Sequence, residues 1–143
     1  MAGIDQAHNI SISIERDFHE VYEFTSQPEN FPRWATGLAT SIEREGDEWV
    51  AQSTDDPVRV RFTPRNQYGV LDHHVTLPGG TEVYVPMRVV ANGSGSEVIF
   101  TLFRTPGMSD EILARDIEWV RTDLGVLKAL LEDDHPNGVG GGG

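Results

Sequence analysis

Two adjacent histidines, His73 and His74, are the residues of this sequence best suited to proton chemistry. They stand in the segment YGVLDHHVTL, residues 68–77, whose alternating apolar side chains predict a β-strand. Successive residues of a strand point to opposite faces of a sheet, so one imidazole faces the core and the other faces solvent. Because an imidazole titrates near neutral pH and both donates and accepts hydrogen bonds, the inward histidine could transfer a proton or orient a ligand.

The remaining polar side chains form no recognisable catalytic or metal-binding motif. The other histidines, His8, His19 and His135, are scattered towards the ends of the chain, and adjacent histidines of one strand cannot both ligate one ion. We therefore expect no metal site and no cofactor. The glycines at 79–80 and 93–95 precede strands rather than helices, so they predict turns and not phosphate-binding loops. The absence of cysteine excludes thiol nucleophiles and disulfides.

The composition is that of an acidic globular protein with one domain. The chain has 143 residues, of which 38% are hydrophobic and 24% charged. A formal net charge of −12 argues against nucleic acid and against anionic membrane surfaces, which both attract basic faces. No apolar run reaches the roughly 20 residues that span a bilayer, and the N-terminus lacks the features of a signal peptide. We expect a cytoplasmic protein, monomeric or homodimeric, that neither binds nucleic acid nor inserts into a membrane.

The hydrophobic periodicity changes from strand-like to helix-like along the chain. The predicted elements, in order, are a strand over 10–14, short helices over 17–24 and 28–37, a hairpin over 40–53, strands over 58–62, 68–77, 81–91 and 96–104, and a long helix over 109–132. Asp17 and Ser26 each precede a glutamate by three residues, which predicts that they cap the two short helices. Because strands joined by short turns pair antiparallel, these elements predict an α+β fold with seven strands.

The long helix has one apolar face. Its apolar residues recur at intervals of three and four: Leu113, Ile117, Val120, Leu124, Leu127 and Leu131. Ser109 is placed to cap this helix, and Trp119 lies off the stripe, where we expect it to pack on the edge of the sheet rather than to bind a ligand. Residues 1–134 are expected to form one domain, followed by a flexible glycine-rich tail over 135–143, either native or added.

The turns between the strands predict which histidine is inside. Closing the turn at 64–69 places Phe62 opposite Leu71, and closing the turn at 77–81 places His73 opposite Val85. One face of the sheet then consists of Val58, Val60, Phe62, Leu71, His73, Val75, Val83, Val85, Met87, Val89, Val98, Phe100 and Leu102. This face is apolar except for His73, which is therefore the inward histidine.

The other face is polar and carries His74. Arg59, Arg61 and Arg88 lie on it, and we expect them to form a solvated charge ladder that includes an Arg61–Asp72 pair. Two interpretations of His73 remain open. It is either a core histidine satisfied by a backbone carbonyl or a trapped water, or the polar anchor of a ligand cavity and the first candidate for a catalytic acid or base.

The opening of the chain resembles a known superfamily. The segment ISIERDFHEVYEFTSQPENFPRW, together with the order of the elements over 8–132, resembles the START-like, or SRPBCC, superfamily with the Bet v 1-like helix-grip fold, and most resembles its bacterial polyketide cyclase/dehydrase-like branch. The resemblance implies a bent seven-stranded antiparallel sheet wrapped around the C-terminal helix, with a cavity between them. It carries over no catalytic motif, and it is specific for fold rather than for function.

The resemblance also implies where a ligand would bind. Inward residues of the sheet, the helix and the second short helix would line the cavity: His73, Val60, Phe62, Leu71, Val85, Met87, Phe100, Leu102, Leu113, Ile117, Val120 and Leu124, with Phe31 and Trp34 at its mouth. The leading hypothesis is binding of a small hydrophobic molecule, lipid-, polyketide- or aromatic-like. The alternatives are a cyclase or dehydratase that uses the same cavity, and a protein-interaction module of the Hsp90-ATPase-activator type.

Overall fold

Antiparallel strands and a long C-terminal helix make up most of the structure, a computed structural model that describes residues 3–35, 39–52 and 56–133. The elements are β1 (Ala7–Ile14), α1 (Phe18–Thr25), the 3₁₀ helix η1 (Pro28–Asn30), α2 (Phe31–Trp34), β2 (Ser41–Glu45), β3 (Glu48–Gln52), β4 (Val58–Phe62), β5 (His73–Thr76), β6 (Glu82–Val85), β7 (Met87–Asn92), β8 (Gly95–Phe103) and α3 (Asp110–Asp133). The predicted α+β class and the order of its elements are confirmed.

The sheet is divided at Pro86. Its strands form a three-stranded part, β1-β8-β7, and a five-stranded part, β2-β3-β4-β5-β6. The sequence predicts one strand over 81–91, whereas the structure ends β6 at Val85 and begins β7 at Met87. Proline has no N–H for a strand ladder, so pairing is interrupted there and the sheet bends. For this reason the described residues form eight strands and not the predicted seven.

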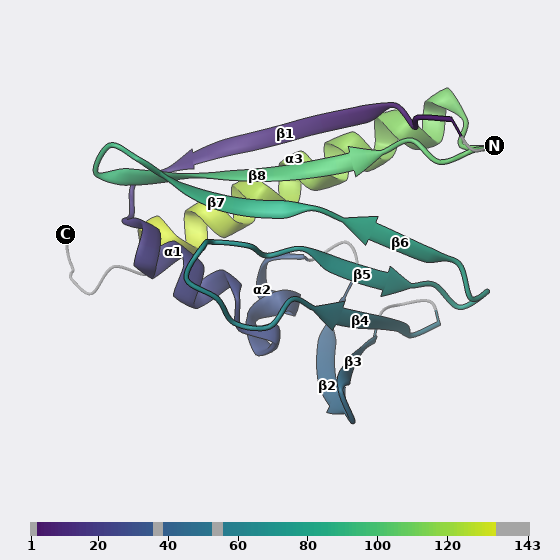
Figure 1. Ribbon diagram of the computed structural model, residues 1–143, viewed down its shortest axis with the longest axis horizontal. Helices are drawn as coiled ribbons and strands as arrows, with labels where there is room; N and C mark the ends of the chain where they lie inside the picture. Colours follow the sequence, from purple (N-terminus) through teal and green to yellow (C-terminus); the bar gives the residue numbers. More distant parts are fainter. Residues whose placement is uncertain (1–2, 36–38, 53–55, 134–143) are drawn as a thin grey trace.

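The long helix α3 lies against the three-stranded part of the sheet. Figure 1 shows α3 running behind β1 and β8, while β4, β5 and β6 extend away from it. Ser109 caps the helix as predicted, since its Oγ accepts the N–H of Ile112 at 3.1 Å. The residues buried along the helix are Leu113, Val120, Leu124, Leu127 and Leu131. No helix among the described residues is long and apolar enough to cross a membrane.

The two short helices differ in how closely they follow the prediction. Asp17 caps α1 as expected, accepting the N–H of Glu20 at 2.8 Å. Ser26 does not cap the next helix, because η1 begins after Gln27 and has no side-chain cap. The predicted helix over 28–37 is instead η1 followed by the single turn α2, and its predicted end near Gly37 lies outside the described residues.

The predicted register of one turn is wrong by two residues. Phe62 lies opposite His73, not opposite Leu71. The reason is a longer connection, in which the strand predicted from residue 68 begins only at His73. Asn66 closes this connection, because its side chain accepts the N–H of Val70 at 3.1 Å and donates to the carbonyl of Val70 at 3.0 Å. A shift of two residues keeps every side chain on its face, so the assignment of inner and outer residues survives.

The other registers agree with the sequence. His73 pairs with Val85, and Met87 pairs with Phe100. His73 is 4% exposed, in the core, and His74 on the opposite face is partly exposed. The prediction of which histidine is inside is therefore confirmed.

Candidate functional site

A cavity of about 330 Å³ opens between the inner face of the sheet and α3. It is lined by Phe31, Trp34, Ala35, His73, Val75, Leu77, Val83, Val85, Phe100, Leu102, Arg115, Asp116, Trp119, Val120 and Asp123. Its volume is at the lower end of the range for ligand pockets. It is also roughly twice the volume of an engineered cavity of about 150 Å³ that holds one benzene ring. The size suits a small molecule of about two rings.

The sheet supplies the apolar wall of this cavity. Alternation along β5, β6 and β8 turns Val75, Val83, Val85, Phe100 and Leu102 to the side that faces the cavity. The cavity exists because α3 packs mainly on β1 and α2, which leaves a space between α3 and the inner side chains of β5 and β6. The residues of this wall were all assigned to the inner face from the sequence.

The predicted ligand-binding residues fall into three groups. Phe31, Trp34, His73, Val85, Phe100, Leu102 and Val120 line the large cavity. Phe62, Leu71 and Met87 line a second cavity of about 20 Å³, which also borders Trp34 and His73. Val60 and Ile117 line neither of these two cavities. The prediction therefore merged two separate spaces that meet at Trp34 and His73.

Four rings form the inner corner of the cavity. Phe31 packs edge-to-face on Trp34, Phe62 and His73, with ring centroids 5.3, 5.5 and 5.9 Å apart. Phe31 and Trp34 are each 3% exposed, so they belong to the inner wall and not to the mouth where the sequence places them. The reason is that α2 follows directly on η1 and directs Phe31 towards β4 and β5, with Trp34 packed against Phe31.

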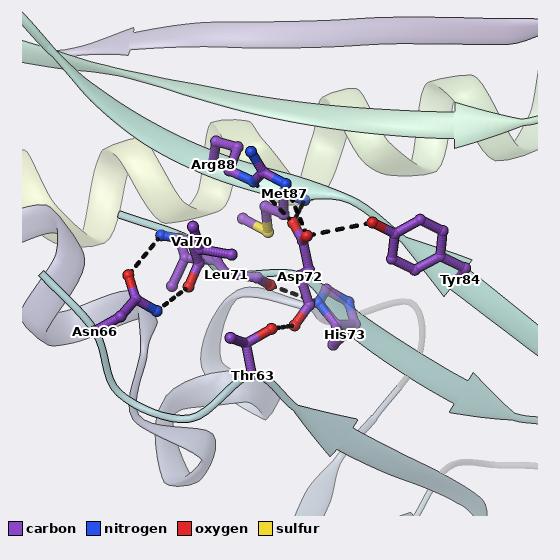
Figure 2. Close-up of polar contacts among 9 residues, drawn as sticks. All are labelled: Thr63, Asn66, Val70, Leu71, Asp72, His73, Tyr84, Met87 and Arg88. Carbon is purple, nitrogen blue, oxygen red and sulfur yellow. Dashed lines mark hydrogen bonds and ion pairs between the residues drawn. The ribbon is translucent and has the colours of Figure 1, made fainter. Parts of the chain in front are cut away.

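His73 is held in one orientation by its own strand. Its Nδ1 lies 3.0 Å from the carbonyl oxygen of Leu71 (Figure 2). A carbonyl only accepts, so Nδ1 carries the proton and donates it, which leaves Nε2 as an acceptor in the neutral ring. Burial lowers the pKa of His73, although the Leu71 carbonyl and the charge of Asp72 act in the opposite direction. The imidazole is therefore neutral, with one satisfied donor and one acceptor nitrogen.

The strand segment that carries His73 is clamped on both sides. The carbonyl of Asp72 accepts the N–H and the hydroxyl of Thr63, at 3.0 and 2.6 Å. The N–H of Leu71 donates to the carbonyl of Met87 at 2.8 Å. These bonds fix the backbone on either side of the imidazole, as Figure 2 shows for Thr63.

The carboxylate of Asp72 ties the two parts of the sheet together on the outer face. It accepts the N–H of Met87 at 2.8 Å and two bonds from the guanidinium of Arg88, at 3.0 and 2.8 Å, while the hydroxyl of Tyr84 lies 3.3 Å away (Figure 2). Burial opposes ionisation, but the bonds from Arg88 and Met87 hold the pKa of Asp72 below its ordinary value. The clamp lies beside Pro86, where strand pairing is interrupted.

The predicted Arg61–Asp72 pair is wrong. Arg61 lies opposite His74, and its guanidinium is 3.6 Å from Glu82. Asp72 lies outside the regular part of β5 and reaches Arg88 instead. The three arginines nevertheless lie on the outer face in ion pairs, as predicted, and they contribute nothing to the cavity.

The wall that α3 contributes is more polar than the sequence predicts. Of the four helix residues expected there, only Val120 lines the cavity, beside Arg115, Asp116, Trp119 and Asp123. The leucine stripe faces the core instead, and residues 116, 119, 120 and 123 form a second face at the same helical spacing. The sequence contains this spacing, but the apolar stripe is more regular and therefore determines the predicted inner face of the helix.

Trp119 also lies elsewhere than the sequence predicts. It lines the cavity and is 48% exposed, so it forms part of the open rim rather than packing on the sheet edge. The guanidinium of Arg115 lies over its ring, 4.5 Å from the centroid, and also 3.2 Å from the carboxylate of Asp116. The rim thus combines an aromatic surface with charges of both signs.

Two buried polar atoms have no hydrogen-bond partner among the described residues. They are Nε1 of Trp34 and Oγ1 of Thr25. Both residues line the small cavity, and Trp34 also lines the large one. A volume of about 20 Å³ has room for one water-sized oxygen. The inner end of the site is therefore small and is bordered by two residues whose buried polar atoms have no partner among the described residues.

The polar groups of the site do not resemble a metal centre. The described residues include no group of three or more His, Cys, Asp or Glu side chains placed to hold a metal ion. His73 makes its described bond to a backbone carbonyl rather than to a carboxylate. The chemistry that the site offers is hydrogen bonding within a largely apolar cavity.

Comparison with known proteins identifies the fold. No family model matches the sequence, and no curated protein matches it. Among solved structures, DynU16, from the dynemicin biosynthetic locus, matches with a TM-score of 0.72 at 17% identity over 93% of this chain. The chain spans about half of that protein's length, 49%.

Two further structures match over almost their whole length. Ara h 8.0201 matches with a TM-score of 0.65 at 12% identity, over 88% of this chain and 97% of its own. The Aha1 dimer from Colwellia psychrerythraea matches with a TM-score of 0.68 at 17% identity, over 94% and 99%. The chain therefore has the Bet v 1-like helix-grip fold, as the resemblance in its sequence implies. Identities this low show the fold alone.

Proposed function

We propose that this protein binds a small, mostly apolar molecule in the cavity between α3 and the inner face of β5, β6 and β8. The observation that carries the proposal is the cavity itself, about 330 Å³ with valine, leucine and phenylalanine side chains along the sheet wall. Protein interiors are normally packed as densely as organic crystals, so a space of this size forfeits packing energy. An apolar ligand would restore those contacts and remove apolar surface from water.

Binding is better supported than catalysis. A cyclase or dehydratase would need a group that gains and loses a proton during the reaction. His73 is the candidate, but burial lowers its pKa and its Nδ1 donates to the neutral carbonyl of Leu71. A carbonyl orients an imidazole without stabilising a full positive charge as a carboxylate would. The geometry therefore favours His73 as a fixed hydrogen-bond acceptor over His73 as a general base.

Native mass spectrometry of the purified protein, followed by denaturing extraction, tests the proposal. We expect a co-purified apolar molecule, or uptake of added two-ring aromatics with a stoichiometry of one. Val83→Trp would fill the cavity from the β6 wall and should abolish the bound mass. Val90→Trp, on an exposed position of β7, is the matched control and should retain it. Equal binding by both variants would place the ligand elsewhere and overturn the proposal.

A further inference from the structure

The indole of Trp34 is a buried donor that the fold leaves without a partner. Its Nε1 has no hydrogen-bond partner among the described residues, although the side chain is only 3% exposed. Buried indole N–H groups are usually hydrogen-bonded, because an unpaired buried donor costs free energy. A phenylalanine would place an aromatic ring at this position without that cost. The presence of a tryptophan is explained if a ligand that enters the site accepts a hydrogen bond from its indole N–H.

The imidazole of His73 offers the complementary group. With Nδ1 donating to the Leu71 carbonyl, Nε2 presents a lone pair and no proton. Burial lowers the pKa of this ring and so keeps Nε2 an acceptor. Trp34 and His73 both make T-shaped contacts with Phe31, and both border the large and the small cavity. The residue with the unpartnered donor and the residue with the acceptor nitrogen therefore border the same two spaces.

Few chemical groups satisfy both rings at once. A carbonyl or an ether oxygen accepts from Trp34 but gives His73 nothing. An ammonium donates to His73 but cannot accept from Trp34. A carboxylate only accepts, and it would enter a cavity lined by Asp116 and Asp123, beside Arg115, whose charge is already paired with Asp116. A hydroxyl both accepts and donates, and it is small enough for the junction.

We propose that the cavity selects neutral ligands that carry a hydroxyl group, whose oxygen accepts from Trp34 Nε1 and whose proton is donated to His73 Nε2. The inference rests on the proposed function and adds the class of ligand to it. The apolar body of such a ligand lies against Val75, Val83 and Val85, and its outer end reaches Trp119 at the rim. A phenol or an alcohol on about two fused rings fits this division.

Isothermal titration with four naphthalene compounds separates binding in the cavity from recognition of the hydroxyl group. Naphthalene tests the cavity alone, 2-naphthol adds the hydroxyl, 2-methoxynaphthalene keeps the acceptor without the donor, and 2-naphthoate adds a charge. We expect 2-naphthol to bind at least about tenfold more tightly than either naphthalene or 2-methoxynaphthalene. Naphthalene can make neither of the two proposed hydrogen bonds, and 2-methoxynaphthalene cannot donate the one to His73. The anion should bind most weakly of the four.

Matched variants assign the effect to the two rings. Trp34→Phe and His73→Leu should each lower the affinity for 2-naphthol towards that for naphthalene, while the affinity for naphthalene changes by less than about twofold. Trp49→Phe, on β3, and His74→Leu, on the outer face, line neither cavity and should leave both affinities unchanged. Circular dichroism checks that each variant is folded.

The outcomes distinguish failure of the inference from failure of the proposed function. If 2-naphthol and 2-methoxynaphthalene bind the wild-type protein equally, the hydroxyl is not recognised and the inference is wrong, whatever the variants do, while the cavity stands. If none of the four compounds binds, the proposed function fails and the inference fails with it. A tenfold preference that survives in both Trp34→Phe and His73→Leu would also overturn the inference.

Discussion

The carboxylate of Asp72 accepts the backbone N–H of Met87 at 2.8 Å, and this bond connects the two parts of the sheet beside the proline that separates them. Pro86 removes one ladder donor and bends the strand, so neighbouring backbone groups need other partners. Asp72 supplies one on the outer face, directly behind the histidine of the cavity. The hydrogen bond between Asp72 and Met87 therefore fixes both the bend of the sheet and the position of His73.

Removing the Asp72 carboxylate should destabilise the fold. Asp72→Ala leaves the N–H of Met87 without its acceptor and breaks the ion pair with Arg88, so we expect a loss of about 2 kcal/mol in the free energy of unfolding. Asp72→Asn keeps an acceptor and should lose roughly half as much. Urea denaturation measures both. Glu82→Ala, which removes the exposed pair with Arg61, is the control and should cost less than about 0.5 kcal/mol.

Stability should fall as the pH drops below about 6.5, because His73 is buried in its neutral form. Burial holds its folded-state pKa below the ordinary value of 6.5, so in this range the unfolded chain binds a proton that the folded protein does not. The contribution is therefore favourable above pH 6.5 and is lost on acidification towards the folded-state pKa, with a limiting slope of about 1.4 kcal/mol per pH unit.

Urea unfolding at pH 7.5, 6.5 and 5.5 would measure this slope for the wild type and for His73→Leu. The variant should lose the part of the slope that belongs to His73, while His74→Leu should keep it. Identical slopes in the wild type and in His73→Leu would show that the imidazole is not buried in its neutral form.

Gly69 cannot be replaced without disturbing the contact between the 63–72 connection and β7. Its φ is +76°, and an added Cβ would lie 2.2 Å from the carbonyl oxygen of Val89 and 2.8 Å from the ring of Phe18. Gly69→Ala should therefore cost about 3 kcal/mol or more, from backbone strain and from a clash with rigid backbone. Gly80→Ala has a similar φ of +92° with nothing within 4 Å of the new atom, and it should cost only about 1 kcal/mol. Similar losses in thermal denaturation would contradict the close approach at Gly69.

The faces of the sheet could be predicted from the sequence, but the exact pairing and the helix wall could not. Alternation fixes whether His73 is inside, and a register error of two residues does not change that answer. The length of the connection depended on the side chain of Asn66, which no periodicity reveals. The face of α3 towards the cavity depended on where the helix sits on β1, a tertiary fact that placed Asp116 and Trp119 beside the apolar wall.

The unpartnered donor at the inner corner was also beyond sequence reasoning. Trp34 reads as one more aromatic residue of a short helix, and its burial together with a free Nε1 appears only when α2 is packed against β5. A tryptophan in the sequence gives no sign of whether its N–H will be satisfied by the protein. For this reason the sequence predicts His73 as the polar group of the cavity and does not predict the donor of Trp34.

Trp119 should contribute more to binding than to stability. It is 48% exposed at the rim, so Trp119→Ala removes a half-buried ring and should lower the free energy of unfolding by about 1 to 2 kcal/mol. The same change removes the aromatic part of the rim, together with the support that Arg115 gains from lying over the ring. We expect the affinity for 2-naphthol to fall by about three- to tenfold, measured by titration calorimetry. Tyr68→Ala removes a ring that is 73% exposed and lines neither cavity, so it should leave the affinity unchanged. Equal affinities for the wild type and Trp119→Ala would mean that the ligand contacts only the sheet side of the cavity and does not reach Trp119 at the rim.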